Sequence, residues 1–300
     1  MQNTGRNWNV KDLPNTAAVI GYPVQHSLSP VVHRYWLKRY NIQGDYITHE
    51  VKPEQLEAFL LGEMPSIFCG INITLPFKES AFYVLEEYVR DEAVRRIGAV
   101  NTVFCKDGEI CDATNTDWYG FEQNILQHVP GFFEQLRKSG RPVMVLGAGG
   151  AARGVLYCLY RQDIPVILSN RTQSTAEALK AVYIETKYGE KIQVIPWEQR
   201  ELPLMEVGFL VNTTSLGMLG KPSLNIPLTN LHPDAVVTDI VYVPLKTELL
   251  KEAEGRGNRI VDGLGMLLHQ AVPGFEGWFG KKPEVTQELR NIVLEARGHV

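Results

Sequence analysis

The sequence has few of the residues that build metal sites or disulfide frameworks. Only four of its 300 residues are cysteines, Cys69, Cys105, Cys111 and Cys158, and their spacing fits no metal-ligand pattern. The seven histidines are scattered along the chain. We therefore predict free thiols in a reducing compartment and no metal site.

Excess charge and long apolar runs are also absent. The chain has 30 basic and 34 acidic residues, a formal net charge of -4, so it shows no basic footprint for nucleic acid. The most apolar stretch, 142–160, is interrupted by Arg153 and by glycines, and the polar N-terminus lacks the apolar core of a signal peptide. We expect a cytoplasmic protein of about two globular domains, without nucleic-acid or membrane partners.

A glycine-rich turn is the first feature that indicates a ligand. In VMVLGAGGAARGV a predicted strand, Val143–Leu146, stops at Gly147, and small residues then open a helix. Backbone N–H groups at such a helix start bind a pyrophosphate, with support from the helix dipole. Gly147 would make the turn, Gly149 would let the phosphates approach, and Ala152 would take the third fingerprint position. A purely structural turn is the alternative.

The next predicted strand, Ile164–Leu168, favours one cofactor. In a Rossmann unit the tip of this strand carries an acid for the ribose 2'-hydroxyl of NAD, or an arginine for the 2'-phosphate of NADP. Here the tip reads Ser-Asn-Arg-Thr, and Arg171 stands 24 residues after Gly147 with no acid beside it. The sequence therefore indicates NADP rather than NAD.

The first half of the chain predicts an α/β domain. Predicted strands and helices alternate, so parallel pairing is expected. The strands are Ala17–Gly21, Tyr46–Val51 and Ile67–Ile73, and the helices between them are Val31–Tyr40 and Glu54–Leu61. A hairpin around Asp107-Gly108 follows, formed by Asn101–Phe104 and Glu109–Ala113.

The second half predicts a doubly wound sheet, in which six strands alternate with helices. The strands are Val143–Leu146, Ile164–Leu168, Gln193–Ile195, Gly208–Val211, Ala235–Asp239 and Arg259–Val261. Ligands lie beyond the carboxyl ends of such strands, where the loop Asn212–Met218 and the segment Tyr242–Pro244 fall. The helix after Gly265 is assigned back to the first domain.

Several polar side chains stand at predicted strand ends and helix starts. Ser29, before Pro30, is the expected N-cap of the first helix, but Ser27 has no such role. The two hydroxyls, beside exposed N–H groups, would also hold a carboxylate. Lys78 is expected in the first turn of a helix, close to Asn72 and Thr74. The helix dipole there disfavours a cation and would make the Lys78 ammonium release its proton more readily, which a lysine acting as an acid or base needs. A solvated surface lysine is the alternative.

Asp117 is expected at the start of the helix that follows the hairpin, directly after Asn115 and Thr116. An acidic residue in a first helical turn has a structural explanation, because the helix dipole favours it there. Its occurrence together with Lys78 argues for chemistry.

These pieces together resemble the shikimate dehydrogenase family of shikimate/quinate dehydrogenases, from about residue 17 onwards. The matching motifs stand in the family's order: GYPVQHSLSP, INITLPFK, IGAVNTV, NTDWYGF, VLGAGGAAR, SNRT, NTTSLGM, DIVYVPLKT and DGLGMLLHQA. The resemblance implies two α/β domains with a cleft between them. Residues 1–116 and 263–300 would form a substrate-binding domain with a mainly parallel sheet, and 117–262 a Rossmann-type NADP-binding domain.

The resemblance also implies an activity and a site. The activity is the reversible NADPH-dependent reduction of 3-dehydroshikimate to shikimate, in chorismate and aromatic amino-acid biosynthesis. Lys78 and Asp117 would be the catalytic pair: Lys78 would give the proton to the ketone oxygen, and Asp117 would hold the ammonium. The substrate residues would be Ser27 and Ser29 for the carboxylate, and Thr74, Asn101, Gln270 and Tyr242. The cofactor residues would be Gly147, Ala148, Gly149, Gly150, Ala151, Asn170, Arg171, Thr172, Thr213 and Gly263.

Two departures and two rival interpretations remain. Many NADP-preferring members have a second base after the Asn-Arg-Thr, but this chain has Gln173, Ser174 and Thr175, so NAD is expected as a weaker alternative cofactor. The tail before Ala17 is expected to be disordered or a surface arm. One rival is a quinate/shikimate dehydrogenase that uses NAD; the other is a non-catalytic nucleotide-binding regulator, against which Lys78 and Asp117 argue. A monomer or a homodimer is expected.

Overall fold

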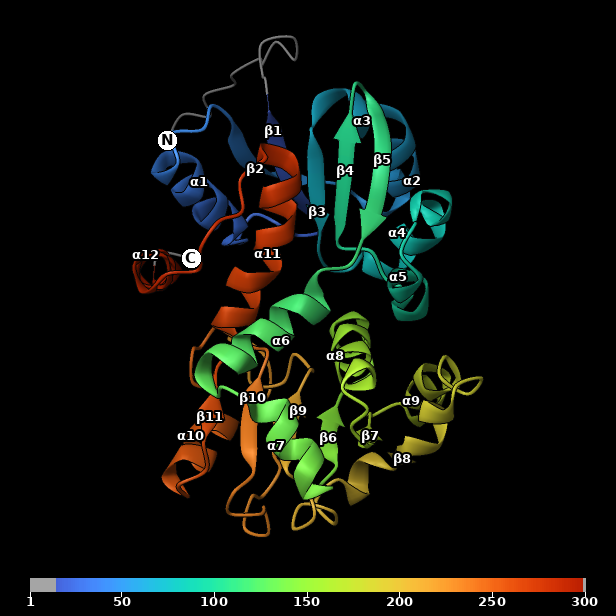
Figure 1. The fold of residues 1–300 in the computed structure, drawn as a ribbon, viewed down its shortest axis with the longest axis vertical. Coiled ribbons are helices and arrows are strands. Elements are labelled where there is room, and N and C mark those ends of the chain that lie inside the picture. The colour runs from blue at the N-terminus through green and yellow to red at the C-terminus, as the bar shows by residue number, and fades with distance from the viewer. Residues whose placement is uncertain (1–14, 299–300) are drawn as a thin grey trace. The chain divides into compact units, whose positions relative to one another are not determined.

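The computed structural model describes residues 15–298, so the expectation for the tail before Ala17 lies almost wholly outside the described residues. The chain divides into two compact units (Figure 1). The first unit comprises residues up to 91, 100–114 and those from 271 onwards, and the second comprises 92–99 and 115–270. Each unit contains one sheet.

The sheet of the first unit has the strand order β2-β1-β3-β4-β5. Its strands are β1 (Thr16–Gly21), β2 (Asp45–Glu50), β3 (Gly70–Ile73), β4 (Thr102–Lys106) and β5 (Glu109–Thr114). The parallel pairing of β1 with β2 and β3 is confirmed, as is the antiparallel hairpin of β4 and β5. Every residue of β1 is buried, which fits a central strand covered on both faces.

The helices of the first unit depart from prediction in one segment. The expected helix Glu54–Leu61 is helical throughout, but its expected end at Leu61 and the expected strand start at Ile67 are wrong. Helical turns run on to Ile67: η2 (Pro53–Gln55), α2 (Leu56–Ala58), η3 (Phe59–Glu63) and α3 (Met64–Ile67). Leu56, Phe59, Leu60 and Met64 are buried at helical spacing, and the Phe68 N–H still bonds the Met64 carbonyl at 3.0 Å. Tertiary burial of this face therefore extends the helix.

The other helices of the first unit are α1 (Ser29–Arg39), α4 (Lys78–Val84), η4 (Glu86–Tyr88) and α12 (Gln287–Arg297). The long α11 (Leu264–Phe279) is shared, because the units divide after Gln270. Its later turns bring Phe275 and Trp278 into an aromatic cluster with Trp36 and Tyr46. This cluster forms part of the core of the first unit.

The sheet of the second unit is wholly parallel and has the order β11-β10-β9-β6-β7-β8. Its strands are β6 (Val143–Leu146), β7 (Val166–Ser169), β8 (Ile192–Ile195), β9 (Phe209–Asn212), β10 (Val236–Asp239) and β11 (Ile260–Val261). The strand order reverses between β6 and β9, as in a doubly wound fold. The predicted fold class is confirmed.

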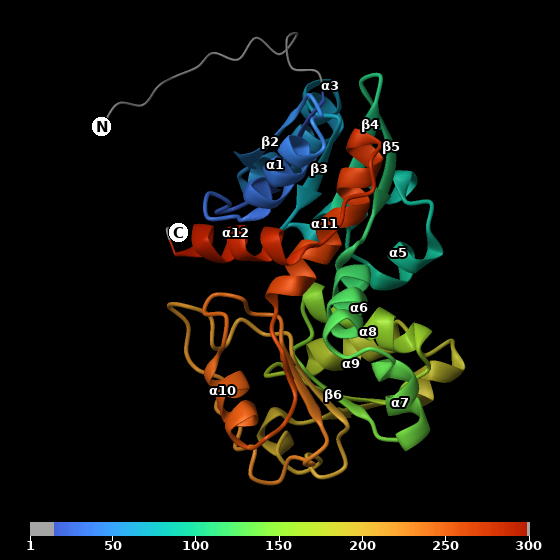
Figure 2. The same ribbon diagram turned by 60° about the vertical axis from the view of Figure 1, so that its left-hand side comes forward.

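Helices cover both faces of this sheet. Val143 and Val145 of β6 pack into one core with α6 (Asp117–His128), α7 (Phe132–Ser139), α8 (Gly150–Arg161) and α9 (Gln173–Ala181). Met144 and Leu146 face the other core, with α10 (Glu248–Gly255), which Figure 2 shows on the opposite side from α7. The shorter elements are α5 (Glu92–Ile97), η5 (Lys187–Lys191) and η6 (Trp197–Gln199).

The predicted alternation of strands with helices is wrong at two crossovers. Only η6 lies between β8 and β9, and the described chain has no helix between β9 and β10. The latter segment contains Pro222, Pro227 and Pro233, which cannot donate helical hydrogen bonds, and Gly217 and Gly220 have positive φ. Within residues 15–298, no helix is long and apolar enough to cross a membrane.

Candidate functional site

The predicted carboxylate cradle lies where the chain enters α1. Ser29 is the first residue of α1 and is buried, while Ser27 is half-buried just before it. The prediction of Ser29 as N-cap is wrong: Leu28 is the N-cap, and its side chain makes no capping bond. Instead, Ser27 Oγ accepts the Ser29 N–H at 3.3 Å, because Ser29 already has helical backbone. The structure brings the two serines together.

Thr74, Lys78 and Asn101 meet at the carboxyl end of β3. The Thr74 N–H bonds the Ile20 carbonyl at 2.9 Å, and the Ile73 N–H bonds the Asn101 carbonyl at 2.8 Å. The carbonyl of Lys78 accepts the Val100 N–H at 2.8 Å, which ties the start of α4 to the chain entering β4. Lys78 is half-buried at the first position of α4, as predicted. These backbone bonds fix three candidate residues within one unit.

A buried hydrogen-bond network supports this cluster. Asn72 donates from Nδ2 to the Asn101 carbonyl at 3.1 Å and to Thr102 Oγ1 at 3.0 Å, and its Oδ1 accepts the Tyr46 hydroxyl at 2.6 Å. Thr102 in turn donates to Asn101 Oδ1 at 2.9 Å, which orients the Asn101 amide. Burial raises the pKa of Tyr46 well above its usual value, and a hydrogen bond with Ser29 opposes that rise. Asn72 therefore connects the serines to Asn101.

Sequence reasoning did not assign Tyr46, Thr102 or His33 to the site. The His33 ring stacks on Tyr46 with centroids 3.9 Å apart, and burial lowers the pKa of His33 to about 3. It is therefore neutral at physiological pH and adds no charge beneath the network. The signal in the sequence was a polar residue in each of two buried strands, Asn72 and Thr102. Buried polar groups require hydrogen-bond partners, so each of these residues indicated a network around it.

Asp117 and Gln270 are brought together in the second unit. Asp117 is buried at the first position of α6, and its N–H bonds Asn115 Oδ1 at 2.9 Å. A Cβ on Gly120, one turn later, would lie 2.6 Å from the Cβ of Gln270, so α6 and α11 are in tight contact. The Thr116 hydroxyl reaches Gln270 Oε1 at 3.5 Å. Lys78 belongs to the first unit and Asp117 to the second, so their pairing stays a prediction.

Close packing of α8 against the start of α6 fixes the Asp117 position further. A Cβ on Gly154 of α8 would lie 3.0 Å from the Asp117 Cβ.

Tyr242 lies beyond β10, where burial raises its pKa. Gly263 is buried beyond β11, where a Cβ would clash with the Ile240 carbonyl.

The glycine turn between β6 and α8 has the geometry that a pyrophosphate requires. Gly147 has a φ of 106°, and a Cβ there would lie 2.6 Å from Thr213 Oγ1. Thr213 is held by its hydroxyl bond to the Leu146 carbonyl at 2.7 Å. At Gly149, the N-cap of α8, a Cβ would meet nothing within 4 Å, and the first turn of α8 has no acidic residue. An anion therefore fits at this helix start, beside Ala148, Gly150 and Ala151.

Arg171 stands exposed beyond β7, just before α9. Asn170 Nδ2 bonds the Thr172 carbonyl at 2.8 Å and so shapes the turn. The first turn of α9 contains no acidic residue, so the residues present suit a 2'-phosphate on an adenosine ribose. The turn and Arg171 together fit NADP.

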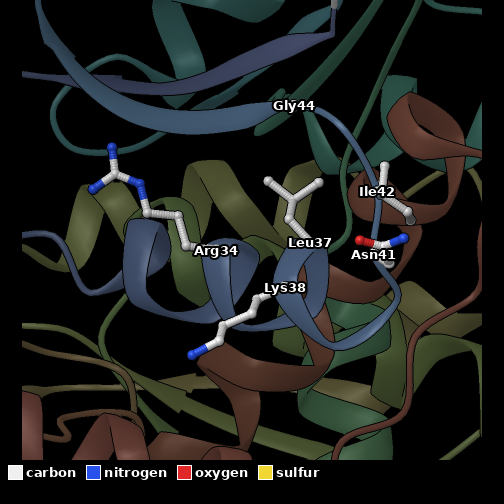
Figure 3. A pocket seen from close by; sticks show the side chains of 6 residues that line it. All are labelled: Arg34, Leu37, Lys38, Asn41, Ile42 and Gly44. Atoms are coloured by element: carbon white, nitrogen blue, oxygen red, sulfur yellow. The ribbon is translucent and has the colours of Figure 1, made fainter.

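Two further features bear on ligands. A surface hollow of about 320 Å³ lies beside α1, and Figure 3 shows the side chains that line it. No predicted site residue is among them, and Arg34 is paired with Asp45 at 2.7 Å. Among the described residues, no cluster of three or more His, Cys, Asp or Glu side chains could hold a metal ion.

The doubly wound sheet and its glycine turn define an α/β protein of the dinucleotide-binding class. Comparison with known proteins makes the class specific. Residues 19–103 match the family model described as the shikimate dehydrogenase substrate binding domain. A shikimate dehydrogenase (NADP(+)) from Cereibacter sphaeroides is 49% identical over 281 residues, which cover 93% of this chain and 96% of the relative. The chain belongs to the shikimate dehydrogenase family.

Solved structures agree in fold. The shikimate 5-dehydrogenase of Thermus thermophilus, in complex with NADP(H) and shikimate, is similar with a TM-score of 0.79 and 31% identity, over 96% of this chain and 100% of that chain. A quinate dehydrogenase from Corynebacterium glutamicum, in complex with NAD, has a TM-score of 0.80 and 27% identity, over 93% of this chain and 98% of that chain. The resemblance stated from the sequence motifs is confirmed.

Proposed function

We infer that the chain catalyses the reversible NADPH-dependent reduction of 3-dehydroshikimate to shikimate, a step of aromatic amino-acid biosynthesis. It is thus an oxidoreductase that acts on a CH–OH group and uses NADP. The observation that carries this function is the placing of Thr74, Lys78 and Asn101 near the carboxyl end of β3 by backbone hydrogen bonds to neighbouring residues, in a chain whose second unit has a dinucleotide-binding turn. The cluster offers polar groups for a hydroxylated ring, and the turn accommodates the cofactor.

We propose Lys78 and Asp117 as the catalytic pair. The reduced nicotinamide supplies the hydride for the ketone carbon. The Lys78 ammonium gives a proton to the ketone oxygen, which becomes the new hydroxyl, and takes the proton back in the reverse direction. The Asp117 carboxylate orients the ammonium. The buried start of α6, where the Asn115 side chain fixes the Asp117 backbone, suits that orienting role.

The other site residues divide between substrate and cofactor. Ser27 and Ser29 bind the substrate carboxylate, and the ring hydroxyls are bound by Thr74, Asn101, Tyr242 and Gln270. The cofactor is held by Gly147, Ala148, Gly149, Gly150, Ala151, Asn170, Arg171, Thr172, Thr213 and Gly263. We propose residues 1–116 and 263–300 as the substrate-binding domain and 117–262 as the NADP-binding domain, although the compact units divide elsewhere and place 92–99, 115–116 and 263–270 in the second unit.

We further propose a cytoplasmic enzyme that acts as a monomer or a homodimer. The four cysteines of the chain are all free thiols, which suits a reducing compartment. The proposed substrate is a small molecule, so the site requires no macromolecular partner.

The carboxylate cradle gives a testable prediction. Ser27→Ala and Ser29→Ala should each raise KM for shikimate roughly 10-fold to 150-fold, because a hydrogen bond to a charged group contributes about 1.5 to 3 kcal/mol. A substrate analogue without the carboxylate should show no further loss. Ser66→Ala, at an exposed serine of the same unit, is the matched control. If the analogue were as sensitive to the two substitutions as shikimate, the cradle would be refuted.

The function is tested by following NADPH formation from shikimate and NADP. We expect turnover with shikimate and weaker use of NAD. Quinate with NAD is a second candidate, favoured by the quinate dehydrogenase among the structural neighbours and by the lack of a second base after Arg171. A higher kcat/KM for quinate with NAD than for shikimate with NADP would establish this second candidate instead.

A further inference from the structure

Asp239, the last residue of β10, is a completely buried carboxylate. Its Oδ1 accepts hydrogen bonds from Asn212 Nδ2 at 2.9 Å and from the Val241 N–H at 3.0 Å. Its Oδ2 accepts the Thr247 hydroxyl at 2.7 Å. The three donors come from the end of β9, the loop after β10 and the N-cap of α10. One carboxylate therefore joins three segments.

The Asn212 side chain, which bonds Asp239, also forms hydrogen bonds within the loop that follows β9. Its Oδ1 accepts the Thr214 N–H at 3.0 Å and the Thr214 hydroxyl at 2.7 Å. Its Nδ2 also donates to the Leu216 carbonyl at 3.2 Å, and the Leu216 N–H bonds Thr214 Oγ1 at 3.1 Å. The Asn212 side chain, oriented by Asp239, therefore sets the shape of the first turn of the loop.

The loops after β9 and β10, residues 213–219 and 240–246, are also bonded directly to each other. We call them the strand-end loops. The Leu219 N–H bonds the Val243 carbonyl at 2.9 Å, and the Ile240 N–H bonds the Asn212 carbonyl at 3.1 Å. A Cβ on Gly217 would lie 3.4 Å from Thr247. A change at Asp239 would therefore move both loops together.

The strand order assigns the strand-end loops to one half of the cofactor. A dinucleotide crosses a doubly wound sheet at the point where the order reverses, here between β6 and β9. Arg171 beyond β7 places the adenosine half on that side. The nicotinamide half then extends over β9 and β10, where Thr213 and Tyr242 lie in the strand-end loops.

Burial of the Asp239 carboxylate lowers the unfolding free energy when the group is charged. Burial raises the pKa of Asp239 to about 6 from 3.8, although its three hydrogen bonds lower it. An acid with a raised pKa in the folded state makes the unfolding free energy fall as pH rises from the unfolded value towards the folded one. The charge therefore destabilises the fold at neutral pH, where a neutral isostere would not. A neutral side chain of the same shape could join the three segments without this loss of stability, so the charge itself needs another explanation.

The other titratable groups near β10 lie on its neighbouring elements. They are Arg259 and Asp262 beside β11, Tyr242 and Lys246 in the loop, and Glu248, Lys251, Glu252 and Glu254 on α10. Four of these eight groups form two exposed ion pairs, Lys246 with Glu254 and Lys251 with Glu248, each with an N–O distance of 2.7 Å. None of these groups is among the causes of the Asp239 shift. Titration of Asp239 is thus governed by burial and its three donors.

We propose that Asp239 is a positioning residue whose charged carboxylate holds the strand-end loops in the shape that receives the nicotinamide half of NADP. This inference rests on the NADP-dependent function proposed above. Charge-assisted hydrogen bonds are roughly twice as strong as neutral ones, so the charge gives the loops a rigidity that an amide would not.

Asp239→Asn tests the proposal because it keeps the side-chain volume and the Oδ1 acceptor but removes the charge. We expect the Kd for NADPH, measured by its fluorescence, and the KM for NADP to rise about tenfold, the scale of one charge-assisted bond. Affinity for adenosine 2',5'-bisphosphate, which lacks the nicotinamide, should not change. As pH falls through about 6, the NADPH Kd should rise more steeply in the wild type than in Asp239→Asn, in which only the protonation of the 2'-phosphate itself contributes.

Glu252→Gln is the matched control, since Glu252 also holds a backbone N–H, that of Leu228 at 2.8 Å, and lies on α10. It should leave NADPH binding unchanged. Equal NADPH binding by the wild type and Asp239→Asn would overturn the proposal, as would an equal loss for adenosine 2',5'-bisphosphate, which would indicate a merely structural role. Failure of the wild type to oxidise shikimate would instead contradict the proposed function, because NADPH binding is measured separately.

Discussion

Replacing Lys78 with alanine is expected to lower kcat by about 10² to 10⁴, the usual contribution of a positioned acid or base. The loss should appear in kcat, because the proton reaches the ketone oxygen only in the transition state. NADPH affinity should be unchanged, since the glycine turn and Arg171 lie in the second unit. Steady-state kinetics in both directions, with NADPH binding measured by fluorescence, check this result.

The control for this variant is Lys106→Ala, at an exposed lysine at the end of β4 in the same unit. It should retain full kcat. Near-normal kcat in Lys78→Ala across the pH range would show that Lys78 is a solvated lysine with no part in proton transfer.

Replacing Arg171 with alanine is expected to lower kcat/KM for NADP by roughly 10-fold to 150-fold and to leave NAD nearly unchanged. A charge-assisted bond from arginine to phosphate contributes about 1.5 to 3 kcal/mol, which corresponds to that range. Because no second base follows, we expect the lower half of it. Added salt should shrink the preference of the wild type, since Arg171 is exposed and its field is screened.

Arg137→Ala removes another exposed arginine of the second unit, on α7, and should change neither cofactor. An equal loss for NAD and NADP in Arg171→Ala would mean that the side chain stacks on the adenine or supports the loop instead of binding the phosphate.

Local pattern was sufficient for most of the fold. The six strands of the second unit were predicted within about two residues, because each is a short apolar run between turn residues. The segment around Ile67 was not, since Leu60 and Met64 become helical through burial that no local pattern reveals. The missing helix between β9 and β10 could have been foreseen from its three prolines.

The site was harder to predict where it depends on distant residues. Ser27, Ser29, Thr74 and Lys78 follow strand ends, a position that the alternation of elements indicates directly. By contrast, Tyr46 bonds Asn72 across 26 residues, and Asn212 bonds Asp239 across 27. Such contacts arise from the pairing order of the strands, which the sequence pattern alone does not determine. The pairing of Lys78 with Asp117 stays a prediction because the two residues belong to different units.

The central claim is that Lys78 and Asp117, carried by different units, act as one catalytic pair. A double-mutant cycle on kcat with Lys78→Ala, Asp117→Asn and the double variant tests it most directly. Residues that act as a unit are strongly non-additive, so the double variant should lose about as much kcat as Lys78→Ala alone. Losses that multiply, with no coupling between the two substitutions, would contradict the pairing and the mechanism built on it.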